Sequence, residues 1–397
     1  MKMRDFKFRN IKTALSQMLM ITWNEIRCIF KDSGVLLILI IAGIGYPLLY
    51  SVVYLGESVD QIPVGIVDEC GDSQSRSFTR KLDATREIEL VDCVNMDEAI
   101  QMMKGRRIHG IVVIPKDFTQ RIGSGRQTTV SLYINMATFF IYKNIALACN
   151  YVMLDEGKNI AIQRCSAQGL TEHESLVAVE PVPNRMTILF NPGNGFASFF
   201  VPGVIVLIIH QLIFLAIGMM TGTRREENDN RKLSTEEDPS KKKVYRYIIG
   251  QGAAYFFIYA IIGTYILMFV PRIFGLPHYA SAWDVYRFLL PFLLAVIFFS
   301  QTWAIFIRNR ETGMVMFLFF SIILLFLSGL TWPVSSFPAF WKYFSYIFPA
   351  TFGVQGFVKL NCCGADFALI SKEFIALWIQ VIVYFVTACL SYRYINK

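Results

Sequence analysis

The stretch FFVPGVIVLIIHQLIFLAIGMM, residues 199–220, contains no Asp, Glu, Lys or Arg. A helix of about 20 apolar residues is long enough to cross roughly 30 Å of membrane hydrocarbon. This stretch therefore predicts a membrane-spanning helix. The same test applied along the rest of the chain predicts six spans, at about 34–54, 197–220, 248–270, 286–307, 314–332 and 372–391.

The composition agrees with a membrane protein. The chain has 397 residues, of which 54% are hydrophobic, and its formal net charge is +8. This apolar fraction exceeds what a soluble core of that size requires. Positive charge is one mark of nucleic-acid binding, but Lys and Arg also collect in the cytoplasmic loops of membrane proteins. We therefore expect lipid contact and no nucleic-acid partner.

A polar segment, residues 55–195, separates the first two spans. Short β-branched runs within it predict strands at 62–67, 88–94, 108–114 and 129–134, and helical patterns at 78–84 and 97–104 lie between them. Alternating strands and helices indicate a small α/β domain with a partly parallel sheet. The predicted fold class is thus a polytopic α-helical membrane protein with an α/β domain inserted between spans one and two.

Residues 139–154 of this insert are apolar but carry Lys143 in their middle. A lysine at the centre of a span costs roughly 2.5–3.5 kcal/mol on insertion into the membrane. We therefore assign these residues to a helix of the insert, at about 138–165, rather than to a seventh span.

Basic residues predict the orientation of the chain, because they concentrate on the cytoplasmic side. They gather before the first span, after span four, at the C-terminus and between spans two and three. The last group comprises Arg224, Arg225, Arg231, Lys232, Lys241, Lys242, Lys243 and Arg246. Both termini are then cytoplasmic and the insert lies outside. The first span lacks a small-x-small cleavage site and is expected to remain as an anchor.

Residues 11–30 have an amphipathic pattern that predicts a helix lying in the inner membrane interface, with Trp23 as an anchor. Charged residues end this segment and follow span four. Such side chains can pair with another subunit across a wet interface or lie among lipid headgroups. The candidates for contact with a partner are Glu25, Arg27, Lys31, Asp32, Arg308, Arg310 and Glu311.

Motifs for catalysis are missing from the sequence. It has no GxxxxGK[ST] loop to bind nucleotide phosphates, and no GxSxG nucleophile. His173 and Glu174 begin like a zinc-protease motif, but Val177 stands where the second histidine belongs. We therefore expect no enzyme activity, metal site or cofactor in this chain.

Fragments in a shared order give the sequence a specific resemblance. They include WNEIR at 23–27, VGIVD at 64–68, GIVVIPKDF at 110–118, NP at 191–192 and LSGLTWPV at 327–334, the last followed by FP at 337–338 and PAT at 349–351. In this order they resemble the ABC-2 type permeases, the transmembrane subunits of bacterial ABC exporters, in the version with a large extracytoplasmic insert.

This resemblance implies a location in the bacterial inner membrane and a set of partners. Two permease copies, or a copy and a paralogue, pair with separate ATP-binding subunits, so ATP and Mg²⁺ bind those partners and not this chain. The position of the insert also suggests a periplasmic adaptor. The expected substrate is a lipid, a glycan or a hydrophobic drug. A non-transporting sensor or an envelope-assembly scaffold that acts through the insert is the alternative function.

Polar and aromatic residues of the late spans are candidates for the transport pathway. Residues 333–361 contain too many Pro and Gly for one span and predict short re-entrant helices, whose Phe337 and Trp341 suit an exit gate or an interfacial belt. Within the spans His210, Gln211 and Gln301 are costly in lipid, so they should face other helices, either to bond them or to meet substrate.

Two of the eight cysteines, Cys70 and Cys93, follow strands that are predicted to be neighbours. Their place outside the cytoplasm is compatible with a disulfide between them.

Overall fold

A computed structural model describes residues 2–56, 59–183, 187, 189–191, 195–227 and 244–395, with side chains from residue 14 to residue 394. The chain divides into two compact units. One, the helical bundle, comprises Met1–Glu57 and Ile188–Lys397, and the other, the insert domain, is Ser58–Thr187. Pro192 and several predicted cytoplasmic charges lie outside the described residues, namely Arg231, Lys232, Lys241, Lys242 and Lys243.

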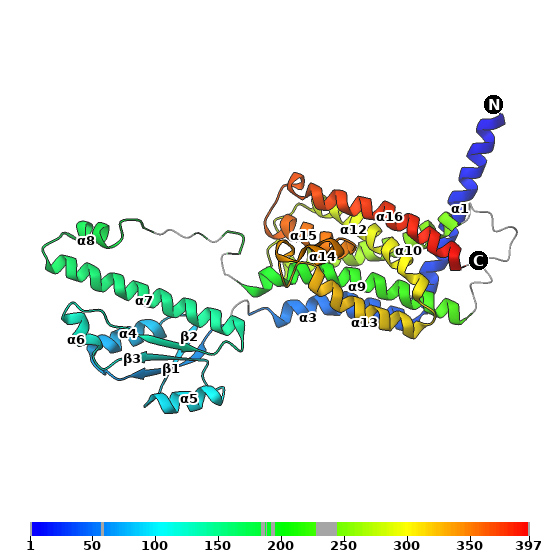
Figure 1. Ribbon diagram of the computed structural model, residues 1–397. Helices are drawn as coiled ribbons and strands as arrows, with labels where there is room; N and C mark the ends of the chain where they lie inside the picture. The colour runs from blue at the N-terminus through cyan, green and yellow to red at the C-terminus, as the bar shows by residue number, and fades with distance from the viewer. Residues whose placement is uncertain are drawn as a thin grey trace. The chain divides into compact units, whose positions relative to one another are not determined.

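Among its described residues, the bundle contains six helical segments long and apolar enough to cross a membrane, which confirms the predicted polytopic helical fold (Figure 1). Their bounds are Ser33–Val53, Phe196–Glu226, Val244–Ile273, Ala282–Phe306, Arg310–Leu327 and Phe367–Tyr394. The first comprises α2 (Ser33–Leu37), a π-helix (Ile38–Gly45) and α3 (Tyr46–Val53). The others contain α9 (Phe196–Glu226), α10 (Val244–Thr264), α12 (Ala282–Trp303), α13 (Arg310–Leu327) and α16 (Ser371–Ile395).

Helix α9 forms the centre of the bundle and packs against α10, α12 and α13. Small residues bring some of these helices very close together. A Cβ atom placed on Gly222 of α9 would lie 2.5 Å from the backbone nitrogen of Arg310. Gly218 of α9 and Gly313 of α13 also meet backbone to backbone. Such crossings increase van der Waals contact where the surrounding solvent is apolar.

The segment between α13 and α16 is broken, as its prolines predict. It contains a 3₁₀ turn at Val334–Ser336, then α14 (Ala339–Ser345) and α15 (Pro349–Cys362). Helix α15 packs against α9, α12 and α16. Gly353 and Gly356 make this packing possible, because a Cβ atom at either position would overlap the ring of Phe292 or Phe288.

The N-terminal helix, α1 (Lys2–Lys31), begins well before the predicted residue 11. It packs against α10. The side chains that it buries include Thr22, Glu25 and Ile29, whereas Trp23 and Phe30 are exposed. The apolar residues of the predicted amphipathic helix therefore lie on two surfaces of α1. Ile29 packs against the bundle, whereas Trp23 and Phe30 are exposed.

The insert domain has a four-stranded sheet of order β2-β1-β3-β4. The strands are β1 (Ile62–Asp68), β2 (Ile88–Asp92), β3 (Gly110–Ile114) and β4 (Ser131–Ile134). β1 pairs in parallel with β2 and β3, and β4 is antiparallel to β3. The sheet is thus partly parallel, as predicted.

Helices cover both faces of this sheet (Figure 1). α4 (Ser73–Asp83), α6 (Phe118–Gly123) and α7 (Phe139–Ala167) share one apolar core with it, and α5 (Met96–Lys104) shares the other. α8 (Glu172–Val179) packs on α7. Asn95 caps the start of α5, because its side chain accepts a hydrogen bond from the backbone nitrogen of Glu98.

The two cysteines considered for a disulfide are both free thiols. Cys93 belongs to the core beneath α5, and its Sγ lies 3.9 Å from the sulfur of Met102. Cys70 packs against the core on the other face, with its Sγ 3.3 Å from Asp72. The predicted disulfide is therefore wrong for this structure, because the two side chains lie on opposite faces of the sheet.

Candidate functional site

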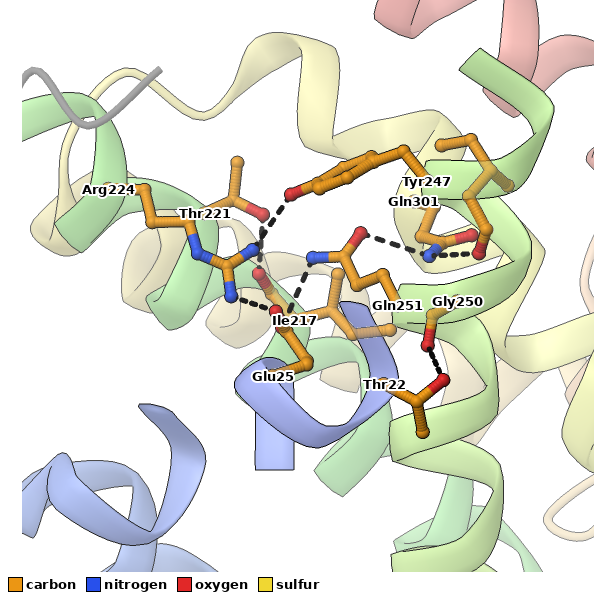
Figure 2. A network of polar contacts seen from close by, with 10 residues as sticks. Thr22, Glu25, Ile217, Thr221, Arg224, Tyr247, Gly250, Gln251 and Gln301 are labelled. Atoms are coloured by element: carbon orange, nitrogen blue, oxygen red, sulfur yellow. Dashed lines mark hydrogen bonds and ion pairs between the residues drawn. The ribbon is translucent and has the colours of Figure 1, made fainter. Parts of the chain in front are cut away.

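An enclosed ion pair joins α1 to the C-terminal end of α9 (Figure 2). The carboxylate of Glu25 pairs with the guanidinium of Arg224, and their side chains are only 4% and 13% exposed. A buried charge is costly unless it is paired and hydrogen-bonded. Glu25 is thus held within the chain, and it can act on another subunit only through α1.

Polar residues of two further helices extend this pair into a network (Figure 2). Gln251 of α10 donates to Glu25 Oε1 at 3.2 Å, and its own oxygen accepts from Gln301 of α12 at 3.1 Å. Arg224 also donates to the hydroxyl of Tyr247 at 2.9 Å, and the Tyr247 ring stacks on Tyr392 of α16 at 4.7 Å. We call Glu25, Arg224, Tyr247, Gln251 and Gln301 the α1 network.

Close backbone approach lets α1 reach these partners. Thr22 donates to the carbonyl oxygen of Gly250 at 2.9 Å. A Cβ atom on Gly250 would lie 2.9 Å from Ile21 and 3.0 Å from the carbonyl oxygen of Met18. Only glycine leaves enough room for α1 at this crossing, so the sequence of α10 fixes where α1 docks.

A second ion pair lies where α1 ends. Both carboxylate oxygens of Asp32 pair with Arg310 at the start of α13, at 2.6 and 2.7 Å. The same carboxylate caps α2 by accepting from the backbone of Gly34 and Val35. Hydrogen bonding to Arg310 holds the pKa of Asp32 below its ordinary value. Two of the predicted partner-contact residues, Asp32 and Arg310, thus bind each other.

The other predicted contact residues remain on the surface. Arg27, Lys31, Arg308 and Glu311 are exposed, and the Arg27 guanidinium lies 5.2 Å from the centre of the Trp23 ring. They come from the end of α1 and the start of α13, next to the Asp32–Arg310 pair. The structure therefore separates the predicted set into charges that fasten helices and charges that are available to a partner.

The predicted pathway residues also separate by their contacts. Gln211 donates to the Ser321 hydroxyl at 3.1 Å and so links α9 to α13, while Gln301 belongs to the α1 network. His210 is fully buried, and neither of its ring nitrogens has a hydrogen-bond partner among the described residues. Its ring meets Phe299 edge-on, with 5.5 Å between centroids. Of the three polar span residues predicted for the pathway, Gln211 and Gln301 bond to other helices, whereas His210 makes no such hydrogen bond among the described residues.

The aromatic residues of the broken segment form a cluster on α14. Trp341 contacts Phe340 and Phe344, with ring centroids 5.4 and 5.9 Å apart, and it is half exposed. Phe337 precedes the helix and packs partly buried against the bundle core.

Comparison of the sequence with known proteins shows the family of this chain. The sequence model for the ABC-2 family of transporter proteins matches residues 33–390. The chain belongs to the ABC-2 family. It is 23% identical over 344 residues to the probable multidrug ABC transporter permease YbhS of Escherichia coli K12, which covers 86% of this chain and 87% of that protein. The same permease from Escherichia coli O157:H7 matches equally.

An ABC-2 permease is a transmembrane subunit and not itself an ATPase, in agreement with the missing phosphate-binding loop. Within the part of the chain that the structure describes, no group of three or more His, Cys, Asp or Glu side chains is placed to hold a metal ion. The α1 network links α1 to α9, α10 and α12 through an ion pair and side-chain hydrogen bonds.

Sequence reasoning missed two members of the network. Arg224 reads as one of many loop charges, and Tyr247 stands just before the predicted span 248–270. One signal was available for Glu25, because Thr22, Glu25 and Ile29 follow each other at helical spacing. A carboxylate between two residues on the inward face of an amphipathic helix indicates a buried cationic partner.

Proposed function

We propose that this chain is the permease subunit of an ATP-driven exporter in a bacterial inner membrane. The observation that carries the proposal is the α1 network, which fastens α1 to α9, α10 and α12 at one end of the bundle. A partner that moves α1 then moves three central helices with it. Membership of the ABC-2 family supports an ATP-binding ABC subunit as that partner.

The partner docks on the end of the bundle that carries both ion pairs. This end is cytoplasmic in our proposal, because α9 ends and α10 begins there and the sequence between these two helices is rich in Lys and Arg. The exposed charges Arg27, Lys31, Arg308 and Glu311 are available for pairing across this wet interface. Glu25 and Asp32 do not face the partner. Their ion pairs with Arg224 and Arg310 fix the positions of the helices next to the exposed charges.

The exported molecule is hydrophobic and drug-like in our proposal. The name of the E. coli relative describes that protein as a probable multidrug permease, and it supports this class above a lipid or a glycan. His210 is the proposed polar contact in the pathway, and the α14 aromatic residues Trp341 and Phe344 are the proposed exit gate. A second copy of the permease or a paralogue completes the pathway.

The test uses the permease together with its ATPase. An ABC ATPase with Walker motifs encoded beside this chain is co-expressed, the complex is purified through a tag on the permease, and both are reconstituted in vesicles. We expect co-purification, ATP turnover that rises in the presence of the permease, and ATP-dependent movement of a hydrophobic fluorescent dye. Inverted vesicles accumulate the dye if transport is outward.

Charge-reversal variants and one control variant locate the coupling surface. Reversing the exposed charges with Lys31→Glu and Arg308→Glu is expected to weaken binding of the ATPase, whereas Lys342→Glu on α14 lies away from the ion pairs and leaves binding unchanged. A purified complex without an ATPase, and without ATP turnover when one is added, contradicts the exporter. The scaffold or sensor acting through the insert domain would then be the better explanation.

A further inference from the structure

One end of the insert domain exposes large apolar side chains. Val59, Met136, Phe139 and Phe140 are 44%, 66%, 63% and 42% exposed. We call these four residues the apolar tip. Scattered exposed hydrophobics are normal, but a contiguous group on a domain surface marks an interaction site.

Backbone contacts within the domain place these residues together. His109 donates to the carbonyl oxygen of Pro63 at 2.8 Å, and Asn135 donates to the carbonyl oxygen of His109 at 3.0 Å. The side chain of Asn144 donates to the carbonyl oxygen of Val59 at 3.2 Å. The start of β1, the end of β4 and the first turns of α7 therefore meet at the same end of the sheet.

The tip has a defined local structure. The side chain of Asn135 accepts from the backbone nitrogen of Ala137 at 2.9 Å, which forms a turn directly before α7. The Phe139 and Phe140 rings contact each other at the start of α7, with centroids 5.8 Å apart. These aromatic side chains are thus presented by an ordered turn and helix.

The covalent chain limits how far this end of the domain can lie from the first span. Val53 is the last residue of the first span, and Val59 follows it after six residues. Six extended residues reach at most about 22 Å. Val59 therefore lies within that distance of the end of a membrane-spanning helix, whatever the orientation of the domain.

We infer that the apolar tip inserts into the lipid interface of the membrane that the bundle spans. Transfer of aromatic and other large apolar side chains from water to the headgroup boundary of a membrane is favourable. A stable protein interface needs about 800 Å² from each partner, more surface than four side chains supply, whereas a lipid surface requires no matching shape. This inference depends on the membrane spans and not on export.

The insert domain also provides a matched control residue. Val94 follows β2 and is 88% exposed. β2 runs parallel to β1, with Ile62 opposite Ile88 and Ile66 opposite Asp92, so Val94 lies at the other end of the sheet from the tip. Val94 is at least as exposed as Phe139 and lacks the short tether to the first span.

The experiment places a photoreactive benzoylphenylalanine at position 139 or 94 of the full chain in nanodiscs of phosphatidylethanolamine and phosphatidylglycerol. After irradiation, mass spectrometry identifies what each probe has bound. We expect several-fold more phospholipid adduct at 139 than at 94. Phe139→Trp and Val94→Trp provide a second measurement, in which brominated lipids quench the fluorescence at 139 but not at 94.

Equal adduct formation at the two positions would overturn the inference, as would equal quenching by brominated lipid. A crosslink from position 139 to a second copy of the chain, detected at twice its mass and without lipid adduct, would also overturn it. Both substituted residues are exposed, so the substitutions should leave the folded domain intact, which size-exclusion chromatography checks. The result does not depend on ATP turnover, and it therefore stands or fails separately from the proposed exporter.

Discussion

Glu25 and Arg224 are 199 residues apart in the sequence and form an enclosed ion pair between α1 and α9. The pair lies on the face of α1 that packs against the bundle, and Gln251 links it to α10 at 3.2 Å. Its energetic role follows from its burial. Each charge is acceptable there only because the other is present.

Removing one partner of this pair should destabilise the bundle. Glu25→Gln leaves the Arg224 charge enclosed without an opposite charge, and breaking a buried pair costs about 3–5 kcal/mol. Thermal unfolding of the purified protein in detergent measures the loss. Glu311→Gln is the matched control, since Glu311 is exposed and its replacement should change stability by less than about 0.5 kcal/mol.

The double variant Glu25→Met with Arg224→Met tests whether the cost comes from the unpaired charge. Apolar residues of similar size often replace a buried ion pair without loss. We expect the double variant to be more stable than either single variant. Additive destabilisation would show that the two side chains act independently and would contradict the pairing.

The Asp32–Arg310 pair should make stability depend on acid pH. The pKa of Asp32 is held below its ordinary value of 3.8 by its hydrogen bond to Arg310. A carboxyl group with a lowered pKa in the folded state stabilises the fold above its unfolded pKa and loses that effect as the pH falls through the folded pKa. The stability advantage of the natural chain over Asp32→Asn should therefore be full at pH 6 and shrink below about pH 4.

A third variant separates the ion pair from the helix cap. Asparagine caps helices about as well as aspartate, whereas alanine does not. Asp32→Ala should thus be less stable than Asp32→Asn by about 1 kcal/mol, and this difference should not change between pH 4 and 6. Equal stability of the two variants would mean that capping of α2 contributes nothing.

The close crossing of α9 and α13 predicts a steric defect. A Cβ atom on Gly222 would lie 2.5 Å from the backbone of Asn309 and Arg310, which has no flexible end to move aside. Gly222→Ala should therefore cost about 1–3 kcal/mol through overpacking and separate Arg310 from Asp32. Thermal unfolding in detergent measures this. Gly45→Ala is the control, because no atom lies within 4 Å of its added Cβ, and it should cause no loss.

The sequence predicted those features that depend on local composition and periodicity. All six spans and the four strands are examples. The length of an apolar run predicts its structure, a membrane span for the long run 199–220 and a buried strand for the short run 110–114. The α1 network was not predictable in this way. Whether Arg224 meets water or Glu25 depends on a glycine, Gly250, that lets α1 approach from far along the chain.

The same reason explains the error at Cys70 and Cys93. Adjacent strands were predicted correctly, but the face on which each thiol lies depends on the register and on the loop after β1. Neighbouring strands alone do not bring two side chains together, since successive residues point to opposite faces.

Thiol chemistry provides the last prediction. Cys149 is fully buried, and burial raises the pKa of its thiol to about 12. Burial also raises the pKa of Cys93. Thiolate is the reactive form, so at pH 8 the Cys149 thiol has roughly a thousandfold less thiolate than one with an ordinary pKa of 9.0.

Iodoacetamide should label the exposed Cys28 and Cys363 first, then Cys70, and should reach Cys93 and Cys149 only after unfolding. Peptide mapping without reductant measures both the labelling order and the pairing. Recovery of Cys70 linked to Cys93 would contradict the placement of these thiols on opposite faces of the sheet, and early labelling of Cys149 would contradict its burial between α7 and the sheet.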